Sequence, residues 1–272
     1  MPQQACSTKR ASHRFTIHCD FEEARAVALL AKYVAMHPDN ERYAGVLAGI
    51  QERRPENRYR EQSIQVSRDA IAAGASGFNV SVNLVYALAD AGRIDEAREI
   101  YDTFRRAQGA NAASKSSQRL FALLEAWIHF NNKEYAKADE IIRRDTATSP
   151  LREDAEFFLV GRMKLGMRRY DEAIAVFNDG LKRATRSCRL WYQLGAAYAT
   201  KGDVATALAT FDKAIAAVPK CGLNYNEAAR LLIKQNRAPA ARQKLETLIK
   251  SASNSDGAVI AKEILAGIGT KS

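Results

Sequence analysis

The chain has 272 residues, of which 47% are hydrophobic, and it carries a formal net charge of +10. This length and hydrophobic content suit one large or two ordinary folded domains and argue against a disordered chain. No hydrophobic run approaches the length of about 18 residues that a membrane-spanning helix needs. Residues 151–272 contribute +8 of the charge, and such asymmetry favours an acidic partner.

Residues 1–19 contain Lys9, Arg10 and Arg14 and no acidic residue. They also lack the hydrophobic block of a secretory signal peptide. We therefore expect a disordered basic tail, and the absence of an export signal predicts a cytoplasmic protein. An organellar transit peptide is the alternative for this segment, because such peptides are also basic and poor in acidic residues.

From Asp20 onward, hydrophobic residues recur with helical periodicity. We predict helices over residues 21–36, 40–53, 61–74, 78–91, 94–107, 117–131, 134–146, 152–166, 170–184, 188–200, 204–217, 222–235, 238–252 and 257–268. Glycine, asparagine and proline mark the turns between them. Because these turns are short, consecutive helices must run antiparallel as helical hairpins.

A regular repeat relates these hairpins. Ala173, Ala207 and Ala241 are spaced 34 residues apart, each near the start of the second helix of a hairpin. Large apolar residues such as Phe177 and Phe211 follow four residues later. A small residue lets two helices approach closely, and a large residue one turn later fills the space behind it. The pattern predicts a stack of similar hairpins.

Residues 188–221 contain a set of residues at characteristic spacings: Trp191, Leu194, Gly195, Tyr198, Ala207, Phe211, Ala214 and Pro219. With these residues at its signature positions, the segment resembles a tetratricopeptide repeat. Residues 78–111, 154–187 and 222–255 resemble the same repeat, although Lys164 stands where an apolar or aromatic residue is usual. Trp127 falls outside the standard register, and we expect Trp191 to be the large buried anchor between hairpins.

The resemblance implies an all-α fold: a right-handed α-solenoid of about six stacked antiparallel hairpins with a C-terminal capping helix. We divide the chain into a disordered tail over 1–19, divergent N-terminal helical hairpins over 20–77, tetratricopeptide-like repeats over 78–255, and a capping helix with a tail over 256–272.

No catalytic motif is present, and we expect no enzyme activity, cofactor or bound metal. Adjacent carboxylates such as Asp95 and Glu96 stand at predicted helix starts, where negative charge complements the helix dipole. His13, His18 and Cys19 match no common spacing of metal ligands.

Cys188 and Cys221 open two consecutive repeats. Stacked helices are about 10 Å apart, which is beyond the reach of a disulfide bond. We therefore expect two free thiols.

The resemblance also implies a binding surface, because tetratricopeptide proteins usually hold an extended or helical peptide on the concave face formed by their first helices. The corresponding residues here are Asn79, Tyr86, Phe158, Arg162, Arg189, Tyr192, Asn226, Arg230 and Lys234. Basic side chains beside aromatic rings suit carboxylates and apolar anchors together. We expect a non-enzymatic scaffold that binds an acidic or amphipathic segment of a protein partner. The alternative is RNA binding through the basic C-terminal half.

Overall fold

The computed structural model describes residues 23–52, 57–75, 78–109, 113–253 and 255–269. These residues form fourteen α-helices and no strand, so the all-α prediction is confirmed. The helices are α1 (Glu23–Met36), α2 (Glu41–Glu52), α3 (Asn57–Ala72), α4 (Phe78–Asp90), α5 (Ile94–Ala107), α6 (Lys115–Asn131), α7 (Tyr135–Thr148), α8 (Asp154–Gly166), α9 (Tyr170–Arg183), α10 (Cys188–Lys201), α11 (Val204–Ala217), α12 (Gly222–Lys234), α13 (Ala238–Ser251) and α14 (Asp256–Gly269). The predicted tail over 1–19, with His13, His18 and Cys19, lies outside the described residues.

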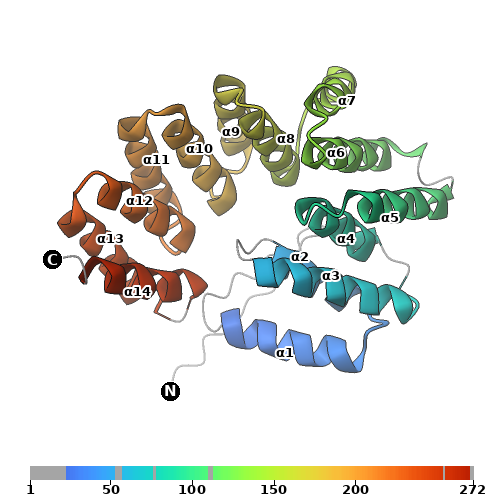
Figure 1. Cartoon of the computed structure of the whole chain (residues 1–272), viewed down its shortest axis with the longest axis horizontal. Helices are drawn as coiled ribbons and strands as arrows, with labels where there is room; N and C mark the ends of the chain where they lie inside the picture. Colours follow the sequence, from blue (N-terminus) through green and yellow to red (C-terminus); the bar gives the residue numbers. More distant parts are fainter. Residues whose placement is uncertain (1–22, 53–56, 76–77, 110–112, 254, 270–272) are drawn as a thin grey trace.

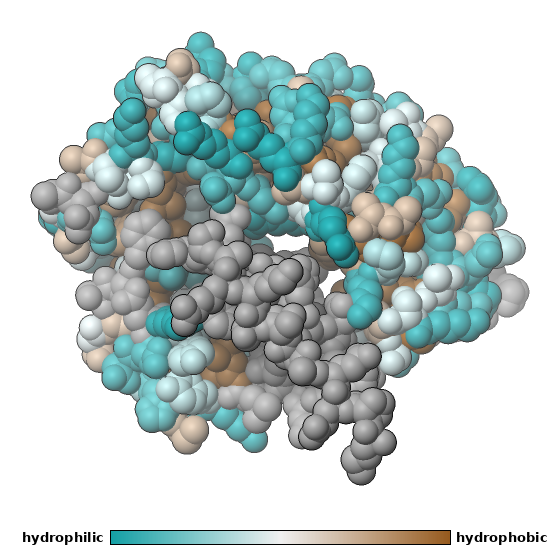
Figure 2. Space-filling view, turned by 180° about the vertical axis from the view of Figure 1, so that it is seen from behind, coloured by the Kyte–Doolittle hydropathy of each residue, from teal (hydrophilic) through white to brown (hydrophobic). Residues whose placement is uncertain are grey.

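The helices form six hairpins, from α2/α3 to α12/α13, with α1 before them and α14 after them. Figure 1 shows the hairpins following one another around an arc, with the first helix of each on the inner side. The space-filling view in Figure 2 shows hydrophilic residues over much of the visible surface, with hydrophobic residues recessed among them. Among the described segments, no helix has the length and apolar character needed to cross a bilayer.

Local signals fix the ends of these helices. The Ser187 hydroxyl accepts a hydrogen bond from the Leu190 amide at the start of α10, and Gly202 ends that helix in the left-handed conformation at φ 96°. Asp203 then caps α11 by accepting a hydrogen bond from the Thr206 amide. A glycine and a short polar side chain therefore complete the turn within a few residues, and α11 folds back along α10.

Within a hairpin, a ring packs against a glycine. Phe177 and Phe211 are fully buried. A Cβ atom placed on Gly161 would lie 2.2 Å from the Phe177 ring, and one placed on Gly195 would lie 2.4 Å from the Phe211 ring. Any larger residue would force the helices apart. Ala173 and Ala207, the small residues of the predicted repeat, are also fully buried, so the predicted small and large residues both lie in the core.

The tryptophans differ from the sequence expectation. Trp127 is the large buried residue, with 1% of its surface exposed. Trp191 is only partly buried at the margin of the core, and its indole nitrogen donates a hydrogen bond to the Thr185 carbonyl. The prediction that Trp191 is the large buried anchor is wrong, because its ring packs only at the edge of the core that α8, α9 and α10 share, and its indole nitrogen bonds to the turn before α10.

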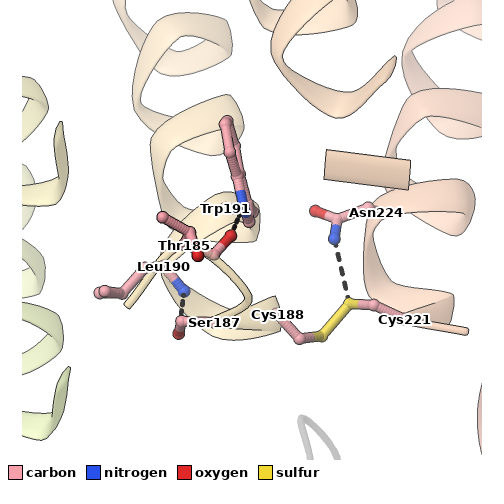
Figure 3. The surroundings of a disulfide bond; sticks show 7 residues. All are labelled: Thr185, Ser187, Cys188, Leu190, Trp191, Cys221 and Asn224. Carbon is pink, nitrogen blue, oxygen red and sulfur yellow. Dashed lines mark hydrogen bonds between the residues drawn. A yellow bond between two sulfur atoms is a disulfide. The ribbon is translucent and has the colours of Figure 1, made fainter. Parts of the chain in front are cut away.

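The expectation of two free thiols is also wrong. Cys188 and Cys221 form a disulfide bond, with their Cα atoms 5.8 Å apart (Figure 3). The packing distance of about 10 Å separates helix axes, whereas these residues stand at the helix starts, Cys188 as the first residue of α10 and Cys221 as the N-cap of α12. Backbones at such positions approach more closely than the axes do.

The stack ends at α14, which packs on α12 and α13. Gly222 and Gly257 touch, since a Cβ atom on Gly222 would lie 2.6 Å from the Gly257 Cα atom. The Asn226 amide donates a hydrogen bond of 3.0 Å to the Gly257 carbonyl. These contacts fix the capping helix on the last hairpin.

Candidate functional site

A continuous row of aromatic rings and guanidinium groups crosses the first helices on the inner side of the arc. Tyr86 of α4 meets Trp127 of α6 edge to face, with ring centroids 6.1 Å apart. The Arg162 guanidinium of α8 lies 4.8 Å from the Trp127 ring centroid and 5.4 Å from that of Phe158. Arg189 of α10 lies 5.0 Å from the same Phe158 ring. We refer to these five residues as the aromatic–arginine ladder.

Spacing along α8 brings two members of the ladder together. Phe158 and Arg162 are four residues apart, so their side chains lie on one face of the helix. Neighbouring first helices are close enough for Arg162 to contact Trp127 of α6 and for Phe158 to contact Arg189 of α10. Cation–π contacts of this kind stabilise a guanidinium group over a ring and fix the plane in which its donors point.

Two carboxylates support the ladder. Asp90 accepts hydrogen bonds from the Trp127 indole at 2.8 Å and from the Asn131 amide at 3.4 Å. Asp154 accepts a hydrogen bond from Arg189 Nε at 2.6 Å. These contacts hold Trp127 and Arg189 in place, because each polar end has a partner on a neighbouring first helix.

Arg162 differs from Arg189 in its hydrogen bonding. Its nearest carboxylate oxygen, on Asp90, is 3.9 Å from Nη1, which is too far for a hydrogen bond. Within the part of the chain that the structure describes, its guanidinium N–H groups donate no hydrogen bond. The side chain is 34% exposed. A stacked, accessible guanidinium with unused donors is suited to bind a carboxylate or another oxyanion.

The site continues onto α12 through Tyr192. Burial raises the pKa of the Tyr192 hydroxyl, and the nearby charge of Glu227 raises it further, while Arg230 and Arg162 act in the opposite direction. Tyr192 is therefore a protonated hydrogen-bonding group at neutral pH. Arg230, half exposed, lies 3.4 Å from Glu227.

The other expected site residues are placed differently. Lys234 is exposed near the end of α12, one turn after Arg230. Asn79 is exposed at the start of α4, beside a shallow pocket that is also lined by His37 and Arg42. Asn226 is buried, and its amide holds the capping helix, so it is not presented to a ligand.

Sequence reasoning missed Trp127, Asp90 and Asp154. Trp127 falls outside the repeat register, so the signature gave no reason to place it on the inner face. The two aspartates stand at the end of α4 and the start of α8, where acidic residues are common on any surface. No group of three or more histidine, cysteine or carboxylate side chains suited to a metal occurs among the residues that the structure describes.

Stacked helical hairpins whose first helices carry a continuous row of contacting side chains define the class of helical-repeat proteins. The family model described as "Tetratricopeptide repeat" matches residues 64–145 and 161–220, which together are more than half of the chain. The chain belongs to the tetratricopeptide repeat family.

Solved structures of other members share this fold. A tetratricopeptide repeat protein from Parabacteroides merdae ATCC 43184 matches with a TM-score of 0.53 and 15% sequence identity, over 89% of this chain and 91% of that chain. A chain of the APC/C hetero-tetramer Cut9-Hcn1 matches with a TM-score of 0.50 and 14% identity, over 90% of this chain but 46% of that chain. The present chain therefore spans less than half of that one. A comparison with curated protein sequences finds no match.

Proposed function

We propose that this protein is a non-enzymatic scaffold that holds an acidic or amphipathic segment of a protein partner on the aromatic–arginine ladder. Proteins of this family are generally interaction scaffolds. The observation that carries the proposal is Arg162, a guanidinium held between two rings with its N–H donors unused by the described residues. A carboxylate fits such a guanidinium through two parallel hydrogen bonds.

The rest of the ladder suits the remainder of such a segment. Tyr86, Phe158 and Tyr192 are partly exposed on the first helices α4, α8 and α10 and offer apolar surface beside the charge. Aromatic and arginine side chains commonly contribute most of the energy at protein interfaces. An extended segment would contact these groups in turn, because each comes from a different helix or helical turn.

A matched pair of double variants tests this proposal. Short peptides selected from a random library on the wild-type protein should be rich in aspartate and glutamate. Arg162→Glu with Arg230→Glu should weaken their binding by more than about 100-fold, because two attractive charges become repulsive. Lys213→Glu with Arg242→Glu changes the net charge equally on exposed parts of the second helices, and should leave the affinity nearly unchanged. Fluorescence anisotropy measures both, and circular dichroism checks that helix content is preserved.

RNA binding would give a different result. If the positive charge acts diffusely, both double variants lose affinity alike, and a single-stranded oligouridylate binds with steep salt dependence. That outcome would replace the peptide proposal with the RNA alternative. Undiminished peptide binding by the Arg162→Glu, Arg230→Glu variant would show that the ladder is not the site.

A further inference from the structure

The disulfide bond joins two helices that line the proposed binding surface. Cys188 begins α10 and Cys221 precedes α12, so the bond links the first helices of consecutive hairpins (Figure 3). Tyr192 lies one turn beyond Cys188, and its hydroxyl is influenced by Glu227 and Arg230 of α12. The position of α12 relative to α10 therefore sets the C-terminal end of the site.

The link also lies at the junction of the last hairpin with the rest of the stack. Among the described helices, α12, α13 and α14 join the rest of the molecule chiefly through contacts of α12 with α10 and α11. In a repeat protein each unit is stabilised by its neighbours, and a terminal unit has a neighbour on one side alone. A covalent bond across this junction therefore ties a terminal unit to its one neighbouring hairpin.

The two sulfur atoms have different surroundings. Cys221 is 6% exposed, whereas Cys188 is partly exposed. The Asn224 amide nitrogen donates a hydrogen bond of 3.0 Å to Cys221 Sγ. Asn224 is fully buried, and its Oδ1 atom has no hydrogen-bond partner. Among the described residues, the hydrogen bond to the Cys221 sulfur is therefore the one hydrogen bond that the Asn224 side chain makes.

We propose that the Cys188–Cys221 disulfide is a redox-controlled staple that fixes the C-terminal end of the site and is opened by attack of a dithiol reductant on Cys188. Cys188, the more exposed of the two cysteines, provides the accessible electrophile. The buried Cys221 sulfur is the leaving group, and the Asn224 N–H stabilises the negative charge that develops on it. The helix start at which Cys221 stands favours the same charge.

The reaction is a thiol–disulfide exchange in two steps. A thiolate of the reductant forms a bond to Cys188 Sγ as the Cys188–Cys221 bond breaks, and the electron pair of that bond remains on Cys221. The second thiol of the reductant then loses its proton and attacks the reductant's first sulfur, which is bonded to Cys188 in the mixed disulfide. This closes the reductant's own disulfide and releases the Cys188 thiolate. The cysteine pair gains two electrons and, on protonation, two protons, while the dithiol becomes a disulfide.

Hydrogen exchange on the whole 272-residue chain tests the staple without any ligand. Cys6→Ser and Cys19→Ser are introduced first, so that Cys188 and Cys221 are the remaining cysteines. Hydrogen exchange is then compared before and after reduction with dithiothreitol. Protection should fall by about 10-fold or more over α12–α14, and it should be unchanged over α4–α7. A uniform change, or none, would overturn the proposal.

The direction of attack is tested by trapping. A monothiol is added, the mixed disulfide is stabilised by alkylation of the released thiol, and peptides are identified by mass spectrometry. The adduct should be on Cys188 and the alkyl group on Cys221. The Asn224→Ala variant should be reduced about 10-fold more slowly, the effect of one lost hydrogen bond, whereas Asn226→Ala, which removes a buried amide that does not contact sulfur, should react at the wild-type rate. An adduct on Cys221, or equal rates for both variants, would exclude this mechanism.

The effect on binding rests on the proposed function and is measured separately. Library-selected peptides should bind the reduced protein more weakly than the oxidised protein. Equal affinities would show that the disulfide bond does not affect the binding site. If no peptide binds either form, the proposed function fails, while the exchange and trapping results still decide the staple.

Discussion

Hairpin α8/α9 contacts its two neighbours through different chemistry. Toward α6/α7 it adds charged side chains to the shared apolar core: Lys164 Nζ lies 2.5 Å from an Asp139 carboxylate oxygen, and Glu156 lies 3.3 Å from the Arg119 guanidinium. Toward α10 it places rings and small residues, with Phe157 packed beside Gly180 and Leu190. Both junctions of this hairpin therefore need complementary shapes, and the junction with α6/α7 also contains ion pairs.

The charged junction is mostly buried. Arg119 is 8% exposed, and it pairs with Asp145 and Glu156 and donates to the Ser149 carbonyl. Lys164 occupies the place where the repeat pattern expects an apolar residue. Burying paired charges adds little net stability, but removing one partner is costly because the other charge is left without compensation. The two junctions should therefore respond differently to substitution.

The largest effect is expected at the apolar junction. Phe177→Ala removes a fully buried ring that fills the space beside Gly161, and it should lower the free energy of unfolding by about 3–5 kcal/mol. Chemical denaturation followed by circular dichroism measures the change. Tyr135→Ala is the control, since Tyr135 is 41% exposed and should cost less than about 1 kcal/mol. Similar losses for the two variants would contradict the packing described here.

A somewhat smaller effect is expected at the charged junction. Arg119→Met keeps much of the side-chain volume but leaves Asp145 and Glu156 without their cation, and it should cost about 3 kcal/mol by the same measurement. Replacing Lys164 by Met should cost less, because Asp139 keeps its ion pair with Arg169. If Lys164→Met were the more damaging of the two, the Arg119 cluster would not be the main support of this junction.

The smallest effect is expected from acid. Burial acts to raise the pKa of Asp139, but hydrogen bonds from Arg169 and Lys164 outweigh it, and the pKa lies below its ordinary value. Its contribution to stability is therefore fully present above the pKa of the unfolded chain, about 4, and is lost as the pH falls through the lower folded value. Asp139→Asn should be less stable than wild type at pH 7 by less than about 1 kcal/mol, and the two thermal melting temperatures should converge at low pH. A difference in melting temperature that grew as the pH fell would show that the ionised Asp139 carboxylate does not stabilise the fold.

The fold could be predicted from the sequence because helical periodicity and the alternation of small and large residues are local signals. Ala173 and Phe177 lie within one helix, and their spacing alone predicts how that helix packs. The acidic pair Asp95 and Glu96 also stands in the first turn of α5, as expected. Glu96 in addition pairs with Arg93 and, across hairpins, with Arg68, which the helix-dipole argument did not predict.

The site could be predicted only in part, because it depends on contacts between hairpins. The ladder includes four expected residues, Tyr86, Phe158, Arg162 and Arg189, but the ring that joins α4 to α8 is Trp127. The repeat pattern places Asn226 on the binding face of α12. Because α12 belongs to the last hairpin, α14 packs over this residue. The disulfide was missed for a similar reason: a distance between helix axes does not give the distance between two residues at helix starts.

The contact between Gly222 and Gly257 restricts how such an array can lengthen. A duplicated hairpin inserted before α14 must offer that helix a surface as flat as Gly222, since any side chain there would collide with the Gly257 backbone. A copy of residues 222–255 meets this condition. A copy of residues 188–221 does not, because Cys188 occupies the position of Gly222 in the 34-residue register and carries a side chain. Of these two hairpins, only the last can therefore be duplicated while the existing terminus is kept.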